Sequence, residues 1–178
     1  MHTQIIHDPT SQPTQIRPVT ILAIDPGASG GIAWMHPGNP VEASAMPSTP
    51  GEILSLLRKI IAQAGGANQV TAYLEQVGGF IPGRPQPASR AFNFGMGYGF
   101  LQGFLMAMEI RTELVTPQRW QASLHMGNSH GLAKAEWKRK LKVKAEQFYP
   151  GLSITLATAD AILILDYAIH QGIQVAVL

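Results

Sequence analysis

The chain has 178 residues, with 13 basic and 11 acidic side chains and a formal net charge of +2. This length allows one domain with a sizeable core. There is no cysteine, which excludes disulfides, thiolate zinc sites, iron–sulfur clusters and cysteine nucleophiles. Six of the 13 basic residues lie between Lys134 and Lys144, so the positive charge is local and indicates a surface that binds a polyanion.

The two ends of the chain differ in composition. Residues 1–19 mix Pro, Thr, Gln and His without apolar periodicity, which predicts a flexible N-terminal tail before one domain over residues 20–178. The apolar stretch 91–108 contains Asn93, Gln102 and four glycines, so we expect a buried helix rather than a membrane span. A cytoplasmic protein is therefore expected, although a location in an organelle is left open.

The N-terminal half of this domain reads as strands around one helix. Residues 20–24 form a β-branched apolar run that stops at Asp25-Pro26-Gly27, and strand character resumes over residues 30–35. A third strand is predicted at 41–45, a helix at 51–64 opened by Pro50, and a fourth strand at 70–75 that ends in Glu75.

In the C-terminal half, helices dominate. Residues 77–90 are broken by Gly and Pro and predict a long functional loop. There follow a helix at 91–108, a fifth strand at 111–115, a helix that starts at Pro117, a basic amphipathic helix at 133–148 and an apolar helix at 159–171. This order predicts an α/β fold, with a five-stranded mixed sheet and helices on both faces.

Acidic side chains stand at the ends of apolar elements. Asp25 and Glu75 each end a buried strand, and Asp160 lies in the first turn of an apolar helix. Each has an ordinary alternative: a turn aspartate, an exposed strand end, or an acid that favours a helix N-terminus. An Asp-containing hairpin with glycines also occurs in sugar-kinase and actin-type ATPases. Three carboxylates on apolar elements together favour a site for a divalent cation, because unpaired buried charge is costly.

Three short motifs carry a family resemblance: Ile24-Asp25-Pro26-Gly27, Leu74-Glu75-Gln76-Val77 followed by Phe80, and Ala159-Asp160-Ala161. In order and spacing the chain resembles RuvC-type Holliday-junction resolvases, particularly the phage-encoded forms. The segment Val115-Thr116-Pro117-Gln118-Arg119-Trp120 is also similar to this group.

The resemblance implies an RNase H-like fold and a homodimeric endonuclease that cuts four-way DNA junctions by phosphodiester hydrolysis. Its implied cofactor is Mg²⁺, with Mn²⁺ as a substitute, held by Asp25, Glu75 and Asp160 as the catalytic residues. The backbone amides at residues 27–30 are a weaker expectation for positioning the scissile phosphate. No partner helicase can be identified from the sequence.

DNA contacts are expected from the basic helix and from the long loop. The cations that we expect to reach phosphate are Lys134, Lys138, Arg139 and Lys142 in the helix, together with Arg84 and Arg90 in the loop. Phe80 is either a wedge at an open junction or a plain loop anchor. Trp137 is either a stacking platform for DNA or a core residue.

A stripe of small residues runs along the predicted helix 91–108. Gly95, Gly99 and Gly103 recur every four residues, which allows close approach of another backbone, either from the chain's own sheet or from a second copy in a dimer. The histidines show no metal-binding spacing, although His125 and His130 flank a polar loop near the predicted site.

The sequence departs from the resolvase pattern at one position. Such enzymes often carry a further acid three or four residues before the last one, where this chain has Ala157 and Leu156. Asp166 is the nearest substitute, but its helical position predicts that it faces away from Asp160. The alternatives left open are an RNase H-like nuclease for flaps or RNA–DNA hybrids, and a junction-binding protein without cleavage activity.

Overall fold

A five-stranded mixed sheet forms the centre of the molecule. In the computed structural model, which describes residues 19–78, 87–127 and 129–175, the strand order is β3-β2-β1-β4-β5. The strands are β1 (Thr20–Asp25), β2 (Gly31–Met35), β3 (Glu42–Ala45), β4 (Val70–Glu75) and β5 (Arg111–Val115). β2 is antiparallel to β1 and β3, whereas β4 is parallel to β1 and β5. The predicted α/β class with a five-stranded mixed sheet is confirmed.

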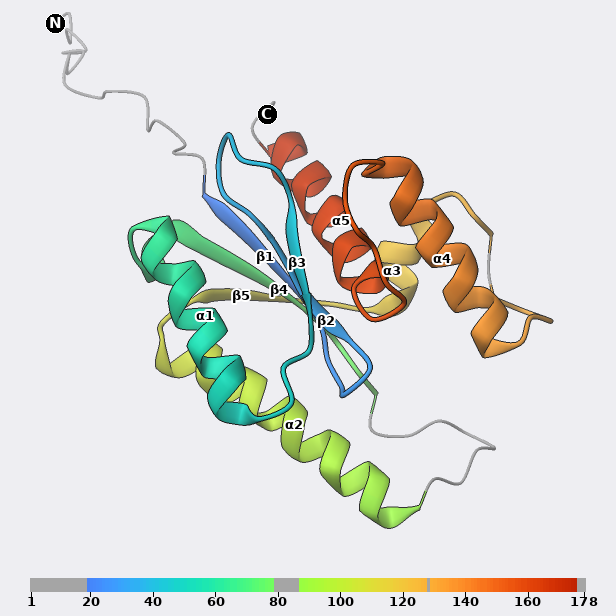
Figure 1. Ribbon diagram of the computed structural model, residues 1–178, viewed down its shortest axis with the longest axis horizontal. Helices are drawn as coiled ribbons and strands as arrows, with labels where there is room; N and C mark the ends of the chain where they lie inside the picture. Colours follow the sequence, from blue (N-terminus) through green and yellow to red (C-terminus); the bar gives the residue numbers. More distant parts are fainter. Residues whose placement is uncertain (1–18, 79–86, 128, 176–178) are drawn as a thin grey trace, which may run out of the picture.

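Helices cover both faces of this sheet (Figure 1). α1 (Pro50–Ala64) and α2 (Ala88–Ala107) lie on one face, and the 3₁₀ turn η1 (Ala67–Gln69) leads into β4. α5 (Ala159–Val175) packs on β1 and β2 from the other side, and both α3 (Pro117–Ala122) and α4 (Lys134–Phe148) pack against α5. A buried apolar cluster fills the space on each side of the sheet.

The side chains of β1 divide between the two cores, as the two-residue period of a strand requires. Leu22 and Ile24 belong to the core under α1 and α2, whereas Ala23 faces α5, as does Ala33 of β2. Small side chains on this face leave room for an apolar helix to lie close to the sheet. As a result, the first turn of α5 lies beside the end of β1.

α2 differs from its prediction in two respects. It begins at Ala88, so the broken segment predicted at 77–90 is shorter and Arg90 lies in a helix. It is also not a buried helix: Leu101 and Leu105 are buried, but the side chain of Phe92 is 69% exposed and that of Met106 is 78% exposed. The N-terminal part of α2 extends beyond the sheet, where the described chain does not cover it (Figure 1). No helix in the described ranges has the length and apolar character of a membrane crossing.

Candidate active site

The turn that follows β1 brings its backbone close to Asp25. Gly27 has a φ of 108°, a conformation that favours glycine, and the amide of Gly30 donates to the carbonyl oxygen of Gly27 at 3.0 Å. A Cβ at Gly30 would lie 2.1 Å from the carbonyl oxygen of Asp25. Glycine is therefore required here sterically. The amide of Gly30 is used inside the turn, and a role of the amides at residues 27–30 in positioning the phosphate stays a prediction.

Three elements bring the predicted acids together at one end of the sheet. Asp25 ends β1, Glu75 ends the neighbouring parallel strand β4, and Asp160 is the second residue of α5. The pairing of Ile24 with Leu74 places the two strand-end acids in adjacent positions. Asp25 and Asp160 are each only 6% exposed. The structure thus places all three residues as the sequence predicted, while their catalytic and metal-binding roles stay predictions.

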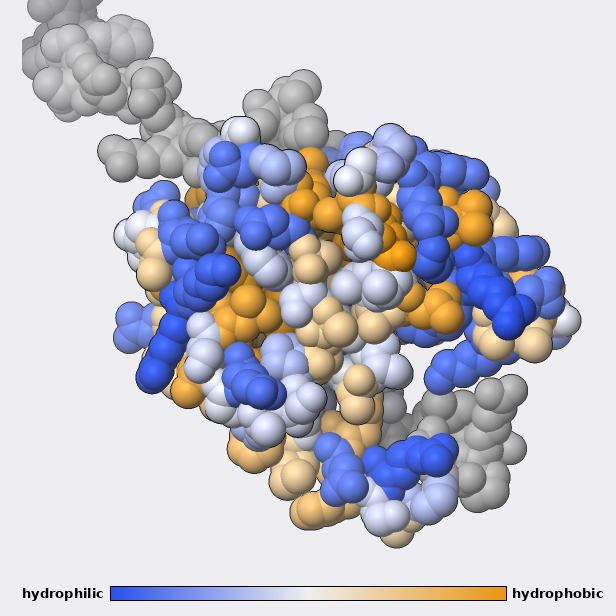
Figure 2. All heavy atoms as spheres, viewed as in Figure 1, coloured by the Kyte–Doolittle hydropathy of each residue, from blue (hydrophilic) through white to orange (hydrophobic). Residues whose placement is uncertain are grey.

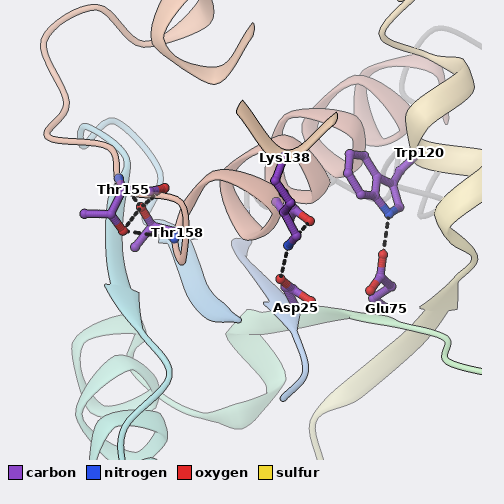
Figure 3. A network of polar contacts seen from close by, with 7 residues as sticks. Asp25, Glu75, Trp120, Lys138, Thr155 and Thr158 are labelled. Atoms are coloured by element: carbon purple, nitrogen blue, oxygen red, sulfur yellow. Dashed lines mark hydrogen bonds and ion pairs between the residues drawn. The ribbon is translucent and has the colours of Figure 1, made fainter. Parts of the chain in front are cut away.

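The ammonium group of Lys138 lies between two of these carboxylates (Figure 3). Its Nζ atom is 2.5 Å from Oδ2 of Asp160 and 3.6 Å from Oδ2 of Asp25. The other carboxylate oxygen of Asp160, Oδ1, is buried and has no hydrogen-bond partner among the described residues. This lysine, which was predicted to contact DNA, therefore pairs with two of the three acids and offsets part of their charge in this structure.

Burial and mutual repulsion disfavour ionisation of the cluster. The pKa of Asp25 is raised from 3.8 to about 7, first by burial and then by repulsion from Asp160, against the attraction of Lys138. Burial likewise raises the pKa of Asp160 and of Glu75. For Glu75 the strongest opposing effect is a hydrogen bond donated by Trp120. Such a concentration of perturbed carboxylates is typical of a functional site.

The donor set of this cluster suits a hard divalent cation. The atoms that could bind a metal are all carboxylate oxygens. Oδ1 of Asp160 is buried without a hydrogen-bond partner among the described residues, and a bound cation would give it one. Within the described residues, however, no three acidic or imidazole groups already enclose a single metal position. In this structure Lys138 pairs with two of these carboxylates. The oxygen donors of the three acids are nevertheless of the type that a hard divalent cation prefers.

The raised pKa of Asp25 gives the metal-free protein a defined pH dependence. Because the folded-state pKa of about 7 exceeds the ordinary 3.8, the stabilisation from protonated Asp25 is complete below the lower value. It is lost as the pH rises through the higher one. We expect the free energy of unfolding in EDTA to fall across this range, and Asp25→Asn to flatten that fall. Urea unfolding at a series of pH values measures it; an equal fall in the variant would contradict this assignment.

The basic residues of α4 lie on different sides of the helix. Lys134, Lys138 and Lys142 recur every four residues, and both Lys138 and Lys134 act electrostatically on Asp160. Lys142 forms an ion pair with Glu146 on its own helix. Arg139 instead lines an outward hollow of about 370 Å³ together with Val143. These three lysines form a lysine stripe along α4, and its members Lys134 and Lys138 are the ones that act on the acids.

The other predicted DNA contacts have different outcomes. Trp137 is buried in the core beneath α4, so it is not a stacking platform. Arg90 is exposed in the first turn of α2. Phe80 and Arg84 lie outside the described residues. Figure 2 shows hydrophilic side chains gathered over α4, on the right of the view.

α5 carries a second acid, Asp166, besides Asp160. Asp166 accepts a hydrogen bond from the Tyr149 hydroxyl at 3.0 Å and lies 3.4 Å from Nδ1 of His170, away from the cluster, as predicted. Ala157, at the position where such resolvases often carry a further acid, precedes α5 and lies in a turn. Its carbonyl would lie 2.6 Å from a Cβ on Gly31, which shows how closely this turn packs on β2.

The arrangement of the five-stranded sheet and its helices is similar to the RuvC fold. No protein-family model matches the sequence, and no curated protein matches it. Among solved structures, RuvC of Thermus thermophilus in complex with a Holliday junction substrate is similar, with a TM-score of 0.53 at 11% identity. The match covers 86% of this chain and 97% of that one. Another T. thermophilus RuvC structure gives a TM-score of 0.49 at 14% identity, with coverage of 86% and 97%. The predicted RuvC-like fold is confirmed.

Proposed function

We propose that the protein is a metal-dependent DNA endonuclease that resolves four-way junctions. The observation that carries the proposal is the convergence of Asp25, Glu75 and Asp160, each at the end of an apolar element, in a RuvC-like fold. The similar T. thermophilus structure holds a Holliday junction, which supports branched DNA as the substrate. The basic stripe on α4 provides positive charge beside the acids.

In this function the acids would bind the cation and the lysines of α4 would contact DNA phosphate. Asp25, Glu75 and Asp160 would hold Mg²⁺, or Mn²⁺ in its place, through carboxylate oxygens. When bound, the cation would activate water and stabilise the leaving oxygen of an in-line phosphodiester displacement. Lys138, freed from Asp160, would carry its charge toward the DNA phosphate, and Lys134 and Lys142 would hold the backbone of the same strand.

A cleavage assay tests this function directly. A synthetic four-way junction and its linear duplex are incubated with the protein and Mg²⁺, and a flap and an RNA–DNA hybrid serve as competing substrates. We expect symmetric nicks in the junction and none in the duplex. Cleavage of the flap or hybrid alone would assign another RNase H-like substrate, and tight junction binding without nicks under any divalent cation would indicate a binding protein.

The lysine stripe predicts a salt dependence. Each phosphate contact contributes roughly 0.9 to the slope of log affinity against log salt. The double variant Lys134→Met and Lys142→Met should therefore flatten the slope of junction binding by about one to two units. A matched control neutralises Arg58 and Lys59 on α1, on the opposite face of the sheet. An equal slope in both variants would place the DNA away from α4.

We also propose that the protein forms a homodimer through α2. Apolar side chains lie exposed along this helix, including Phe92, Met96 and Phe100. Figure 2 shows apolar residues interspersed with hydrophilic ones over the lower projection of the molecule. A Cβ on Gly95, Gly99 or Gly103 would meet nothing within 4 Å in the described chain, so packing of the stripe on its own sheet is excluded. This face is suited to the close approach of a second α2.

A single glycine substitution tests the dimer. Gly99→Glu fits the folded monomer, because its Cβ has free space, but it introduces bulk and charge where the partner helix would approach. We expect the variant to sediment as a monomer, whereas Gly51→Glu on α1, which also has free space, remains dimeric. A monomeric wild type, or a dimeric Gly99 variant, would contradict packing through α2.

A further inference from the structure

The tryptophan that ends the motif at residues 115–120 contacts the acidic cluster directly. Trp120 is fully buried at 0% exposure, and its indole Nε1 donates to Oε1 of Glu75 at 2.9 Å (Figure 3). The two residues are 45 positions apart in the sequence. This bond gives the motif at residues 115–120, which contains none of the three acids, a contact with the acidic cluster.

Local structure places this indole with little freedom. β5 ends at Val115, which pairs with Glu75, and the amide of Gln76 donates to the carbonyl of Val115 at 2.7 Å. Thr116 then caps α3 by accepting from the amide of Arg119, and Pro117 occupies the first turn. The strand end that carries Glu75 and the helix that carries Trp120 are therefore joined through one backbone pairing.

The chemistry of the bond suits a carboxylate that must also bind a cation. An indole N–H is a donor only and does not titrate, so it can hold one carboxylate oxygen without competing for a metal. The indole contacts Oε1 alone, so it does not occupy Oε2 of Glu75. The bond also favours the ionised carboxylate against the effect of burial on its pKa.

The other tryptophans provide a comparison within the same molecule. The Nε1 atoms of Trp34 and Trp137 are buried and have no hydrogen-bond partner among the described residues. A buried indole in this fold therefore persists without a partner, and the bond to Glu75 is a particular feature of Trp120. A Trp→Phe change at the other two positions removes no hydrogen bond within the described part of the chain, which makes them matched controls.

We propose that Trp120 is a positioning residue that fixes the Glu75 carboxylate for cation binding, and that its indole senses whether a cation is bound. The inference rests on the proposed metal-dependent function. Cation binding would withdraw charge from the carboxylate that the indole contacts, so the emission of Trp120 would change on binding. Groups that orient metal ligands typically contribute about 10- to 100-fold to metal affinity.

The first experiment measures Mn²⁺ affinity by electron paramagnetic resonance of the free ion, without DNA. Trp120→Phe should bind Mn²⁺ at least about tenfold more weakly than wild type, whereas Trp34→Phe and Trp137→Phe should remain within about twofold. Equal affinity in Trp120→Phe and wild type would overturn the proposal. Mn²⁺ binding by a wild type that fails to cut junctions would instead contradict the proposed function alone.

The second experiment does not require Trp120→Phe to fold. In the double variant Trp34→Phe and Trp137→Phe, Trp120 is the remaining tryptophan of the three in the chain. We expect its emission to change when Mg²⁺ is added, and Glu75→Gln in the same background to abolish that change. An emission that does not respond to Mg²⁺, or responds equally in the Glu75 variant, would overturn the proposed contact with the cation site.

Discussion

Asp25→Asn, Glu75→Gln and Asp160→Asn should each reduce junction cleavage by at least about a hundredfold, the upper range for residues that only support metal ligands. Each change removes an anionic oxygen ligand and keeps the volume of the side chain. Junction binding should persist, or strengthen, because the acids repel phosphate when no cation neutralises them. Single-turnover cleavage and binding in EDTA measure the two effects separately.

The matched control for this series is Asp166→Asn. Asp166 lies on the same helix as Asp160 but contacts Tyr149 and His170 rather than the cluster. We expect this variant to cleave at the wild-type rate, with some loss of stability from the Tyr149 hydrogen bond. Normal cleavage by any of the three acid variants would remove that residue from the active site, and inactive, folded Asp166→Asn would show that the site extends along α5.

The acids could be located from the sequence because a carboxylate at the end of an apolar segment is unusual, and the segment that reveals it is short. Asp25 ends a β-branched run at a Pro-Gly turn, and Glu75 ends a second apolar run, so both strands and their ends were readable without tertiary information. Parallel strands bring their carboxyl ends to one edge of the sheet. The position of Asp160 followed from the apolar helix that carries it.

The contacts around the acids could not be predicted, because they join distant parts of the chain. Lys138 and Asp160 are 22 residues apart, and a basic amphipathic helix does not reveal which of its lysines turns inward. Trp120 was part of a recognised motif, but its bond to Glu75 depends on the pairing of β4 with β5. The only feature of the sequence that pointed to this bond was an indole N–H donor placed shortly after a strand.

The exposure of α2 shows a limit of composition. Apolar side chains and small residues predict burial, but they do not distinguish burial within a chain from burial against another copy. Leu101 and Leu105 are buried against the sheet, whereas Phe92, near the N-terminal end of α2, is exposed. From composition alone, a hydrophobic helix that is longer than the sheet beneath it is therefore predicted to be buried along its whole length. Only the fold shows where the sheet ends.

Lys138→Met should destabilise the metal-free protein by about 2 kcal/mol. Removing one partner of a buried ion pair costs about 3–5 kcal/mol, and partial exposure of the lysine together with proton uptake by Asp25 reduces that cost. Because the ammonium and a cation use the same oxygens of Asp25 and Asp160, the variant should bind Mn²⁺ more tightly than wild type. It should nevertheless cleave more slowly, since the charge that would reach the phosphate is lost.

The decisive measurement is urea unfolding with and without Mn²⁺. A cation at a hundred times its Kd adds about 2.7 kcal/mol to the folded state, enough to offset the loss in Lys138→Met. Lys142→Met, which breaks the surface pair with Glu146, should lose only about 0.5 kcal/mol and gain no more from Mn²⁺ than wild type does. The loss of stability and the tighter Mn²⁺ binding are linked because the cation replaces the ammonium group. If Mn²⁺ raises the free energy of unfolding of Lys138→Met by no more than that of wild type, Lys138 does not occupy the cation's place.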